Sequence, residues 1–559
     1  MPIKKELISL FDSIAELLEF TGGNKFKISA FKNASNTIRR IEGDVEAMIA
    51  DGSINNVPGI GKSIQSVIYE FMETGLSTEY ENLSNVVPKG IIEVFNIRGL
   101  GAKKIRTLYE ELGVDSIESL EQACIDNRVA NLKGFGGKTQ AKITEEIMNT
   151  KKRKGFLLLN KAFMKGDLLL NEISQMSSVK GIEFTGELRR KLEVISSIEL
   201  MAKVTGYAEF ENDLANSFKY NKLQESIHFN SSELKNDIDD RIIIHYTTES
   251  NYDRALFITT GSDKFFEGAG IDEDNISCNS EESILGEFNL PFIIPEMREH
   301  EYFTANKEIN LSSNLQLKDF NGFLHFHTTK SDGQNTLKEM VKSAIDLGFE
   351  YMVVCDHSKS AFYANGLSEE RVLLQKQEVR EVGSQLGVKI FQGIESDILK
   401  DGSLDYDNDF LKNFQFVVAS IHSIFNLSEE EMTARIIKAI ENPFTDLLAH
   451  PTGRLLLARD PYNVNIKKVI DACVTNDVAL EINASPHRLD LDWRNIYYAR
   501  EKACKFAINP DAHSTDGIKQ TQYGIMMARK GGMQKVDVIN CYNIKDFEKY
   551  INRKILRTN

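Results

Sequence analysis

From residue 321 onward the chain alternates short apolar runs with helical patterns, and this alternation constrains its fold more than any other feature. Helical stretches such as LKEMVKSAIDLG (337–348) and NIKKVIDACVTND (465–477) separate the apolar runs. Strands that alternate with helices favour a parallel sheet or barrel. We therefore expect an α/β barrel over residues 321–559.

Seven of the predicted strands finish in or contain His, Asp or Glu. In a βα barrel the carboxyl ends of the strands converge on one face, so these side chains can meet there. His325 and His327 are two residues apart and point to the same side of a strand. The strand-end residues are His325, His327, Asp356, His357, Glu395, Asp397, His422, His450, Glu481, Asp511 and His513.

This set of side chains predicts a metal cluster. Imidazole and carboxylate together suit Zn²⁺, Mn²⁺ or Fe²⁺, and without cations the carboxylates would repel one another. The ligands are too many for one ion and fit two or three, an arrangement that suits phosphoester hydrolysis. A single strand-end histidine would more often be a hydrogen-bonded core residue. His228, His245 and His300 are isolated and are interpreted as structural.

The first 150 residues contain three similar glycine turns, VPGIGKS (57–63), IRGLGAKK (97–104) and LKGFGGKT (132–139). Each combines Gly-x-Gly with a following lysine and a helical pattern. The glycines allow a tight turn and let backbone N–H groups approach an anion at the next helix N-terminus. Gly-x-Gly can also simply end a helix. The expected DNA contacts are Gly59, Gly61, Lys62, Gly99, Gly101, Lys103, Lys104, Gly134, Gly136 and Lys138.

Charge and composition narrow the class of protein. The net charge of −15 argues against a generic nucleic-acid binder, but residues 1–154 carry 21 basic and 21 acidic residues, so the acidic excess lies after them. We find no apolar run long enough to span a membrane. The six cysteines are scattered without a CxxC pair, which is typical of reduced thiols in a cytoplasmic protein.

The motifs LHFHTTKSDG, CDHS, GIESDI, SIHS, AHPTGRLL, EINASPHRLDL and PDAHS resemble the PHP (polymerase and histidinol phosphatase) domain of bacterial family X DNA polymerases. FDSIAELLEFTGGNKFKISAFKNASNTI and LPFIIPEMRE resemble other parts of the same polymerases, so the resemblance spans nearly the whole chain. It implies a multidomain fold with an α-helical N-terminal region of helix-hairpin-helix motifs, an α+β palm and thumb, and a distorted (βα)7 TIM-like barrel.

The resemblance also implies domain bounds. These are a small helical domain with the first hairpin (1–80), a fingers-like hairpin domain (81–150), a degenerate palm (151–265), a thumb-like segment (266–305), a linker (306–320) and the PHP domain (321–559).

For the site, the resemblance implies a cluster of two or three Mn²⁺ or Zn²⁺ ions and 3′-5′ exonuclease activity. Asp356, Arg454 and Arg488 are the other catalytic candidates; Asp356 would orient a ligand, and the arginines would clamp a phosphate or form structural salt bridges. The implied metal ligands are His325, His327, Asp332, His357, Glu395, His422, His450, Asp511 and His513.

The palm departs from the family pattern of Gly-Ser, a basic stretch and Asp-x-Asp. In TGELRRKLEVISSIEL (185–200), Glu187 replaces the serine, and Ser197 and Glu199 replace the two aspartates; Asp239 would be the third carboxylate. Serine cannot supply a charged bridging oxygen between two metal ions. We therefore expect no Mg²⁺ at the palm and no polymerase activity, unless the register differs.

The leading hypothesis is a DNA-repair hydrolase, a monomeric cytoplasmic phosphodiesterase that processes 3′ ends of gapped or nicked DNA. The first alternative is an active gap-filling polymerase with a PHP proofreading exonuclease. The second is a DNA-binding scaffold with a structural metal cluster. A histidinol-phosphatase-like activity would leave the hairpins without a role.

Overall fold

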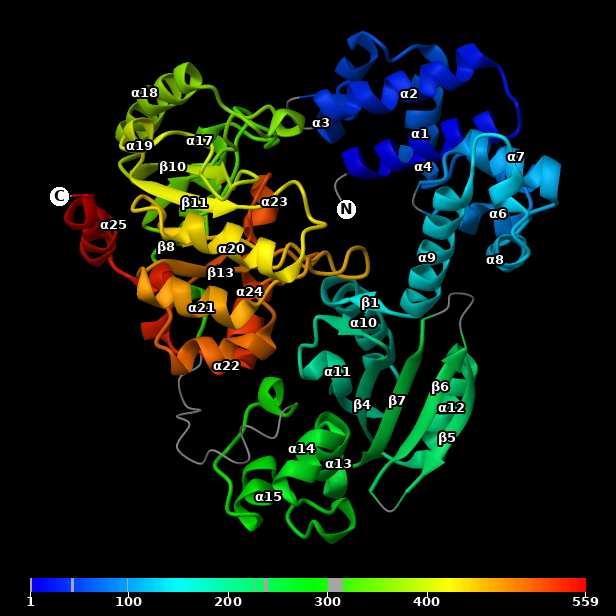
Figure 1. The fold of residues 1–559 in the computed structure, drawn as a ribbon. Helices are drawn as coiled ribbons and strands as arrows, with labels where there is room; N and C mark the ends of the chain where they lie inside the picture. Colours follow the sequence, from blue (N-terminus) through cyan, green and yellow to red (C-terminus); the bar gives the residue numbers. More distant parts are fainter. Residues whose placement is uncertain are drawn as a thin grey trace. The chain divides into compact units, whose positions relative to one another are not determined.

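The computed structural model describes residues 3–41, 45–97, 99–226, 228–235, 240–299 and 315–558 of the chain (Figure 1). The chain divides into two compact units, residues 1–154 and 155–559. Among the described residues, no helix combines the length and the apolar character that crossing a membrane would require.

The first unit is entirely helical in its described part. Leu7, Phe11 and Phe31 are fully or almost fully buried in one apolar core, and Ile91, Ile105 and Leu120 are buried in a second core. Its α-helices are α1 (Ile3–Phe20), α2 (Lys25–Arg40), α3 (Val45–Ala50), α4 (Lys62–Thr74), α5 (Thr78–Val86), α6 (Lys89–Val94), α7 (Ala102–Leu112), α8 (Ile117–Ile125) and α9 (Gly137–Arg153).

The three glycine turns have the same local structure. In each, the apolar residue between the glycines donates its backbone N–H to the carbonyl oxygen of the residue three positions earlier. The N–O distances are 3.1, 3.2 and 3.1 Å for Ile60, Leu100 and Phe135. The first glycine of each turn has a positive φ, which a residue with a side chain rarely adopts. The second glycine is the N-cap of α4, α7 or α9.

The second unit begins with an α+β subdomain built on a five-stranded sheet of order β2-β4-β7-β6-β5. Only β4 and β7 run parallel, and the other neighbours are antiparallel. The strands are β2 (Val179–Phe184), β4 (Ile198–Val204), β5 (Lys219–Glu225), β6 (Asn230–Lys235) and β7 (Ile242–Thr248), while β1 (Leu157–Leu158) and β3 (Val194–Ile195) form a separate pair. The helices are α10 (Leu159–Ser174), α11 (Gly186–Arg189), α12 (Tyr207–Ser217), α13 (Tyr252–Thr260), α14 (Asp263–Ala269) and α15 (Glu281–Glu287).

The remainder of the second unit is a seven-stranded parallel sheet in which every strand pairs with its sequence neighbour. A parallel bridge between Phe326 and Ala512 joins the two edges and closes a distorted barrel. The strands are β8 (Gly322–Phe323), β9 (Tyr351–Val354), β10 (Lys389–Asp397), β11 (Phe416–Ser420), β12 (Leu447–Leu448), β13 (Ala479–Asn483) and β14 (Phe506–Asn509).

Helices follow the strands of the barrel, and side chains fill its interior. Val353, Phe391, Phe416 and Val418 are fully buried there. The α-helices are α17 (Leu337–Asp346), α18 (Glu369–Leu386), α19 (Asn408–Leu411), α20 (Glu429–Ile440), α21 (Ile466–Thr475), α22 (Trp493–Glu501), α23 (Thr515–Ile518), α24 (Thr521–Lys530) and α25 (Ile544–Thr558). The predicted fold class, a helical hairpin region, an α+β middle region and a (βα)7 barrel, is confirmed.

Candidate metal centre and the altered palm

All nine predicted ligand positions follow or end strands of the barrel, and the fold brings them to one place. Nitrogen and oxygen atoms of eight of them form three groups, within each of which the atoms lie no more than 4.8 Å apart. The groups are His327, Asp332, His357 and His513; His325, His327, Glu395 and Asp511; and His357, Glu395 and His422. The ninth, His450, places Nε2 at 3.0 Å from Glu395 Oε1. His327, His357 and Glu395 each belong to two groups, so the groups are contiguous.

The buried polar atoms of this cluster fit a metal site. His325, His327, Glu395 and His450 are at most 1 % exposed. In the described part of the chain, His325 Nε2, His327 Nδ1, His357 Nδ1, Glu395 Oε2 and His450 Nδ1 are buried atoms without a hydrogen-bond partner. Buried polar atoms are nearly always satisfied in folded proteins. Divalent ions would satisfy most of these lone pairs, so the residues present fit the ions that the sequence predicts.

The carboxylates and imidazoles of the cluster shift one another's pKa values strongly. Burial alone would raise the pKa of Glu395, but His422 and His357 outweigh it and hold the pKa well below its usual range. Burial, together with the neighbouring His513 and His357, lowers the pKa of His327 to about 4. Neighbouring carboxylates outweigh burial and raise the pKa of His422 to about 10 and that of His513 to about 9. At neutral pH Glu395 is therefore ionised and His327 neutral, the forms that ligate metal ions, whereas His422 and His513 must each release a proton when they bind one.

Two further carboxylates orient ligands by hydrogen bonds. Glu481 is fully buried, and its Oε1 lies 2.8 Å from His325 Nδ1 while its Oε2 accepts the His450 backbone N–H at 3.0 Å. Asp397 Oδ1 lies 2.6 Å from His422 Nδ1. A carboxylate on the second ring nitrogen fixes the tautomer and raises the basicity of a metal-binding histidine. Both residues lie at predicted strand ends, and this position along the chain is what indicated them in the sequence.

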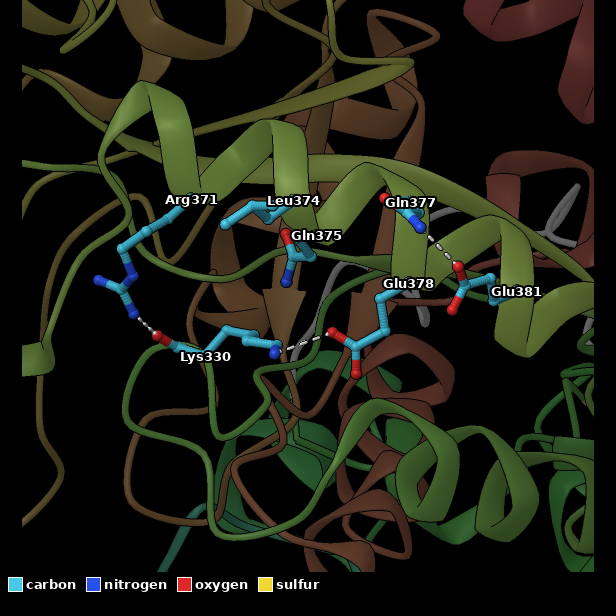
Figure 2. Close-up of a pocket in the computed structure, with 7 residues that line it drawn as sticks. All are labelled: Lys330, Arg371, Leu374, Gln375, Gln377, Glu378 and Glu381. Atoms are coloured by element: carbon cyan, nitrogen blue, oxygen red, sulfur yellow. Dashed lines mark hydrogen bonds and ion pairs between the residues drawn. The ribbon is translucent and has the colours of Figure 1, made fainter.

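Asp356 faces the loop after His327 rather than the cluster. Its Oδ1 accepts the Thr328 backbone N–H at 2.8 Å, and its Oδ2 accepts Thr328 Oγ1 at 2.7 Å and Gln375 Nε2 at 2.5 Å. Gln375 belongs to α18 and lines a pocket of about 280 Å³ beside this loop, where Lys330 pairs with Glu378 (Figure 2). Asp356 thus fixes the segment between His327 and Asp332.

The two arginine candidates differ in what they contact. The Arg454 guanidinium pairs with Asp492, and its Nε donates to the Arg488 carbonyl at 2.9 Å, so its donors are occupied within the protein. Among the described residues, the half-buried Arg488 guanidinium has no carboxylate partner. Arg454 thus supports the segment that carries Arg488.

The altered palm contains a buried hydrogen-bond network. Glu199, on β4, accepts Ser197 Oγ at 2.6 Å and lies 3.2 Å from Nε2 of His245, on β7. His245 Nδ1 in turn lies 2.8 Å from Ser231 Oγ. Burial raises the pKa of Glu199, but its hydrogen bonds to His245 and Ser197 prevail and lower it. Asp239 lies outside the described residues. No local sequence pattern indicates that His245 lies near Glu199, because the pairing of β4 with β7 brings the two together.

The Glu199 carboxylate also covers Gly186, the glycine that the predicted register aligns with the Gly-Ser pattern. Gly186 has a φ of +56°, and a Cβ built on it would lie 2.6 Å from the Glu199 carboxyl carbon. Glu187, in place of the serine, accepts the Ser196 backbone N–H at 2.5 Å. Both substituted glutamates are thus engaged by the palm itself.

The hairpin residues are presented as the sequence predicts locally. Lys62, Lys103 and Lys138 are exposed at the starts of α4, α7 and α9. None of the three N-cap glycines provides a side-chain hydrogen bond to its helix. The third residue of each helix, Ile64, Lys104 or Thr139, donates its backbone N–H to the N-cap carbonyl. Among the described residues the N–H groups of the first two residues have no acceptor, which is the geometry that phosphate binding uses.

Comparisons with known proteins identify the hairpin region and the barrel. Family models match residues 2–77 as a helix-hairpin-helix domain, 91–149 as a SAM-like helix-hairpin-helix tandem, and 324–485 as a PHP domain. The DNA polymerase/3′-5′ exonuclease PolX of Bacillus subtilis (strain 168) is 33% identical over 98% of this chain and 99% of its own length.

The barrel alone has other relatives. A probable phosphatase of Thermoanaerobacter sp. (strain X514) is 28% identical over 41% of this chain and 95% of its own length. A probable phosphatase of Acetivibrio thermocellus is 28% identical over 41% of this chain and 94% of its own length. The barrel is thus similar to complete proteins that consist of little else.

Proposed function

We propose that this chain, which belongs to the PolX family of DNA polymerase/3′-5′ exonucleases, hydrolyses phosphodiesters at DNA 3′ ends and no longer polymerises DNA. The observation that carries this proposal is the ligand cluster, in which nine side chains of metal-binding type meet at the carboxyl ends of the barrel strands. Mn²⁺ is the ion that we propose for the active enzyme, since the mixed imidazole and carboxylate ligands suit it.

Divalent ions at this cluster would bind the phosphate oxygens and lower the pKa of water to supply the nucleophile. The protein's own contribution is to hold the ligands in place. Glu481 orients His325, Asp397 orients His422, and Asp356 fixes the loop that carries Asp332. Arg488, beside the cluster, would contact a phosphate of the substrate.

The hairpins provide the proposed DNA contacts of the first unit. Three helix N-termini, at which the first two backbone N–H groups have no acceptor in the described part of the chain, each lie beside an exposed lysine. They suit the sugar–phosphate backbone and not the bases. Binding of this kind is independent of sequence, as an enzyme that processes DNA ends requires. The overall negative charge of the chain does not oppose it, because residues 1–154 carry equal numbers of acidic and basic residues.

The proposed loss of polymerisation rests on the palm network. Nucleotidyl transfer needs closely spaced carboxylates that hold two metal ions about 3.5–4 Å apart. Ser197 is not a carboxylate, and the Glu199 carboxylate accepts hydrogen bonds from Ser197 and lies beside His245. With Glu199 above Gly186, a negative charge occupies the place next to the glycine turn and would repel a nucleotide triphosphate.

The test is a denaturing gel of a 5′-labelled primer–template incubated with the purified protein and Mn²⁺, with and without dNTPs. We expect the primer to shorten in both reactions without extension. Extension in the dNTP reaction would refute the loss of polymerisation and favour the alternative of a gap-filling polymerase, the activity in the name of the Bacillus relative.

A matched variant separates hydrolysis from binding. His513→Ala removes one predicted ligand, and we expect it to abolish shortening while DNA affinity, measured by fluorescence anisotropy, stays within about twofold of wild type. Full metal loading without any shortening by the wild-type protein would instead favour the scaffold alternative, in which the metal cluster is structural.

A further inference from the structure

An exposed pair of aromatic side chains lies at the edge of the metal centre. Phe362 is 87 % exposed and Tyr363 is 70 % exposed, on the short helix η7 (Phe362–Ala364) between β9 and α18. The Tyr363 ring centroid lies 6.3 Å from the ring centroids of both His357 and His422. Adjacent exposed apolar side chains beside a reaction centre indicate a contact surface for a ligand.

The loop that carries the pair is fixed at both ends to residues around the cluster. The Ser360 backbone N–H donates to Asp405 Oδ2 at 2.6 Å, and Ser360 Oγ donates to Asp397 Oδ2 at 2.9 Å. At the other end, the Leu367 backbone N–H donates to the His357 carbonyl at 2.8 Å.

The inward positions of the loop are already filled. Ala361 and Ala364 are buried on either side of the pair. The aromatic rings therefore remain outside, on a loop that is ordered before any ligand arrives. Rigid aromatic side chains give contact area at little cost in conformational entropy.

The charges beside the pair indicate what it binds. The Tyr363 hydroxyl feels the charges of Asp397, Glu395 and Asp332, which metal ions at the cluster would neutralise, and then that of Arg488. In the described part of the chain no carboxylate pairs with the Arg488 guanidinium. A ligand that satisfies both features carries a phosphate next to a flat apolar ring, which describes a nucleotide. A small phosphate ester would reach the metal cluster and Arg488 but would leave both rings in water.

We propose that Phe362 and Tyr363 form a stacking platform for the base of the 3′-terminal nucleotide of single-stranded DNA. This inference rests on the proposed function, since it names the substrate feature that the same site recognises. Stacking on aromatic rings is tolerant of sequence because every base has a flat face. The platform selects an unpaired end, because a terminal base within a duplex is already stacked on its neighbour.

The test compares two oligonucleotides that differ only at the 3′ end, one with a terminal thymidine and one with a terminal abasic tetrahydrofuran residue. Affinity is measured in EDTA by competition, and kcat/KM for removal of the last residue is measured in Mn²⁺. For wild type we expect the base-containing end to be favoured by about 10- to 100-fold in both measurements. Dividing the affinity or kcat/KM of the base-containing oligonucleotide by that of the abasic one cancels the contribution of the hairpins to DNA binding.

The double variant Phe362→Ala/Tyr363→Ala should reduce this ratio to about 1, whereas Phe362→Trp should retain it. The matched control is Val536→Ala, which removes an exposed apolar side chain from the short helix η8 (Lys535–Asp537) of the same unit. An unchanged ratio in the double variant, or an equal loss on both ends, would overturn the proposal. If wild type hydrolyses neither end, the proposed function fails, and the ratio measured in EDTA still decides for or against the platform.

Discussion

Replacement of Glu481 by glutamine should weaken metal binding without touching a proposed ligand. Glu481 Oε1 is shared by His325 Nδ1 at 2.8 Å and Asn509 Nδ2 at 3.1 Å, and Oε2 accepts the His450 backbone N–H at 3.0 Å. Every one of these contacts needs an acceptor. Glutamine preserves the size of the side chain but has only one acceptor oxygen, so its NH₂ group must face a donor.

The magnitude follows from these contacts. Loss of a partner that orients a metal-binding histidine costs about 10- to 100-fold in metal affinity, which is about 1.4–2.7 kcal/mol. A buried donor left without an acceptor costs about 1–3 kcal/mol of folding stability. We therefore expect Glu481→Gln to need about 10- to 100-fold more Mn²⁺ for half-maximal hydrolysis and to unfold at a lower temperature.

The assay is a Mn²⁺ titration of 3′-end hydrolysis, with bound metal measured after gel filtration and thermal unfolding recorded in EDTA. The control is Glu370→Gln, which neutralises an exposed carboxylate in the first turn of α18. A Mn²⁺ requirement equal to that of wild type, with Glu481→Gln folded, would refute the orienting role of Glu481.

Three further predictions concern metal removal, the palm and pH. EDTA should lower the unfolding temperature, and Mn²⁺ should restore it, because ions that bind only the folded state stabilise it; an unchanged temperature would contradict a cluster held by buried ligands. His245→Ala should destabilise the protein by about 1–3 kcal/mol in urea unfolding, since Glu199 loses a buried partner, while hydrolysis keeps its rate; loss of hydrolysis in the folded variant would contradict the separation of palm and barrel functions. Despite burial, Arg298 and Arg189 lower the pKa of Glu281 from 4.5 to about 2. A carboxyl group whose pKa is lower in the folded than in the unfolded state stabilises the folded protein at pH values above the unfolded-state pKa. This stability is lost as the pH falls through the folded-state pKa. The unfolding free energies of wild type and Glu281→Gln should therefore converge as pH is lowered from 4.5 toward 2; a pH-independent difference would count against this ion pair.

The barrel was predictable because its signals are local. Each strand is a short apolar run, and its end carries a His, Asp or Glu whose position along the chain is fixed by the strand. The convergence of His325, His357 and Glu395 then follows from the topology of a parallel barrel, in which all strand ends meet on one face.

The palm was less predictable because its altered site depends on pairing between distant strands. β4 and β7 lie side by side with Met201 opposite His245, which brings the imidazole to Glu199. No local pattern indicates this pairing, so His245 could only be interpreted as an isolated residue. The same reasoning applies to Arg454, whose contacts with Asp492 and the Arg488 carbonyl arise from tertiary packing.

Packing against the barrel gives the palm a structural role that does not depend on its own chemistry. Glu193 of the palm accepts the Trp493 indole N–H at 3.0 Å and a hydrogen bond from Arg494 at 2.6 Å. Lys530, at the end of α24, is fully buried and donates to the Arg190 and Glu296 carbonyls at 3.1 Å each. Without the palm and the segment that carries Glu296, these carbonyl partners would be gone and the α22 and α24 surfaces would face water. The palm therefore supports the barrel structurally, whatever its own chemistry.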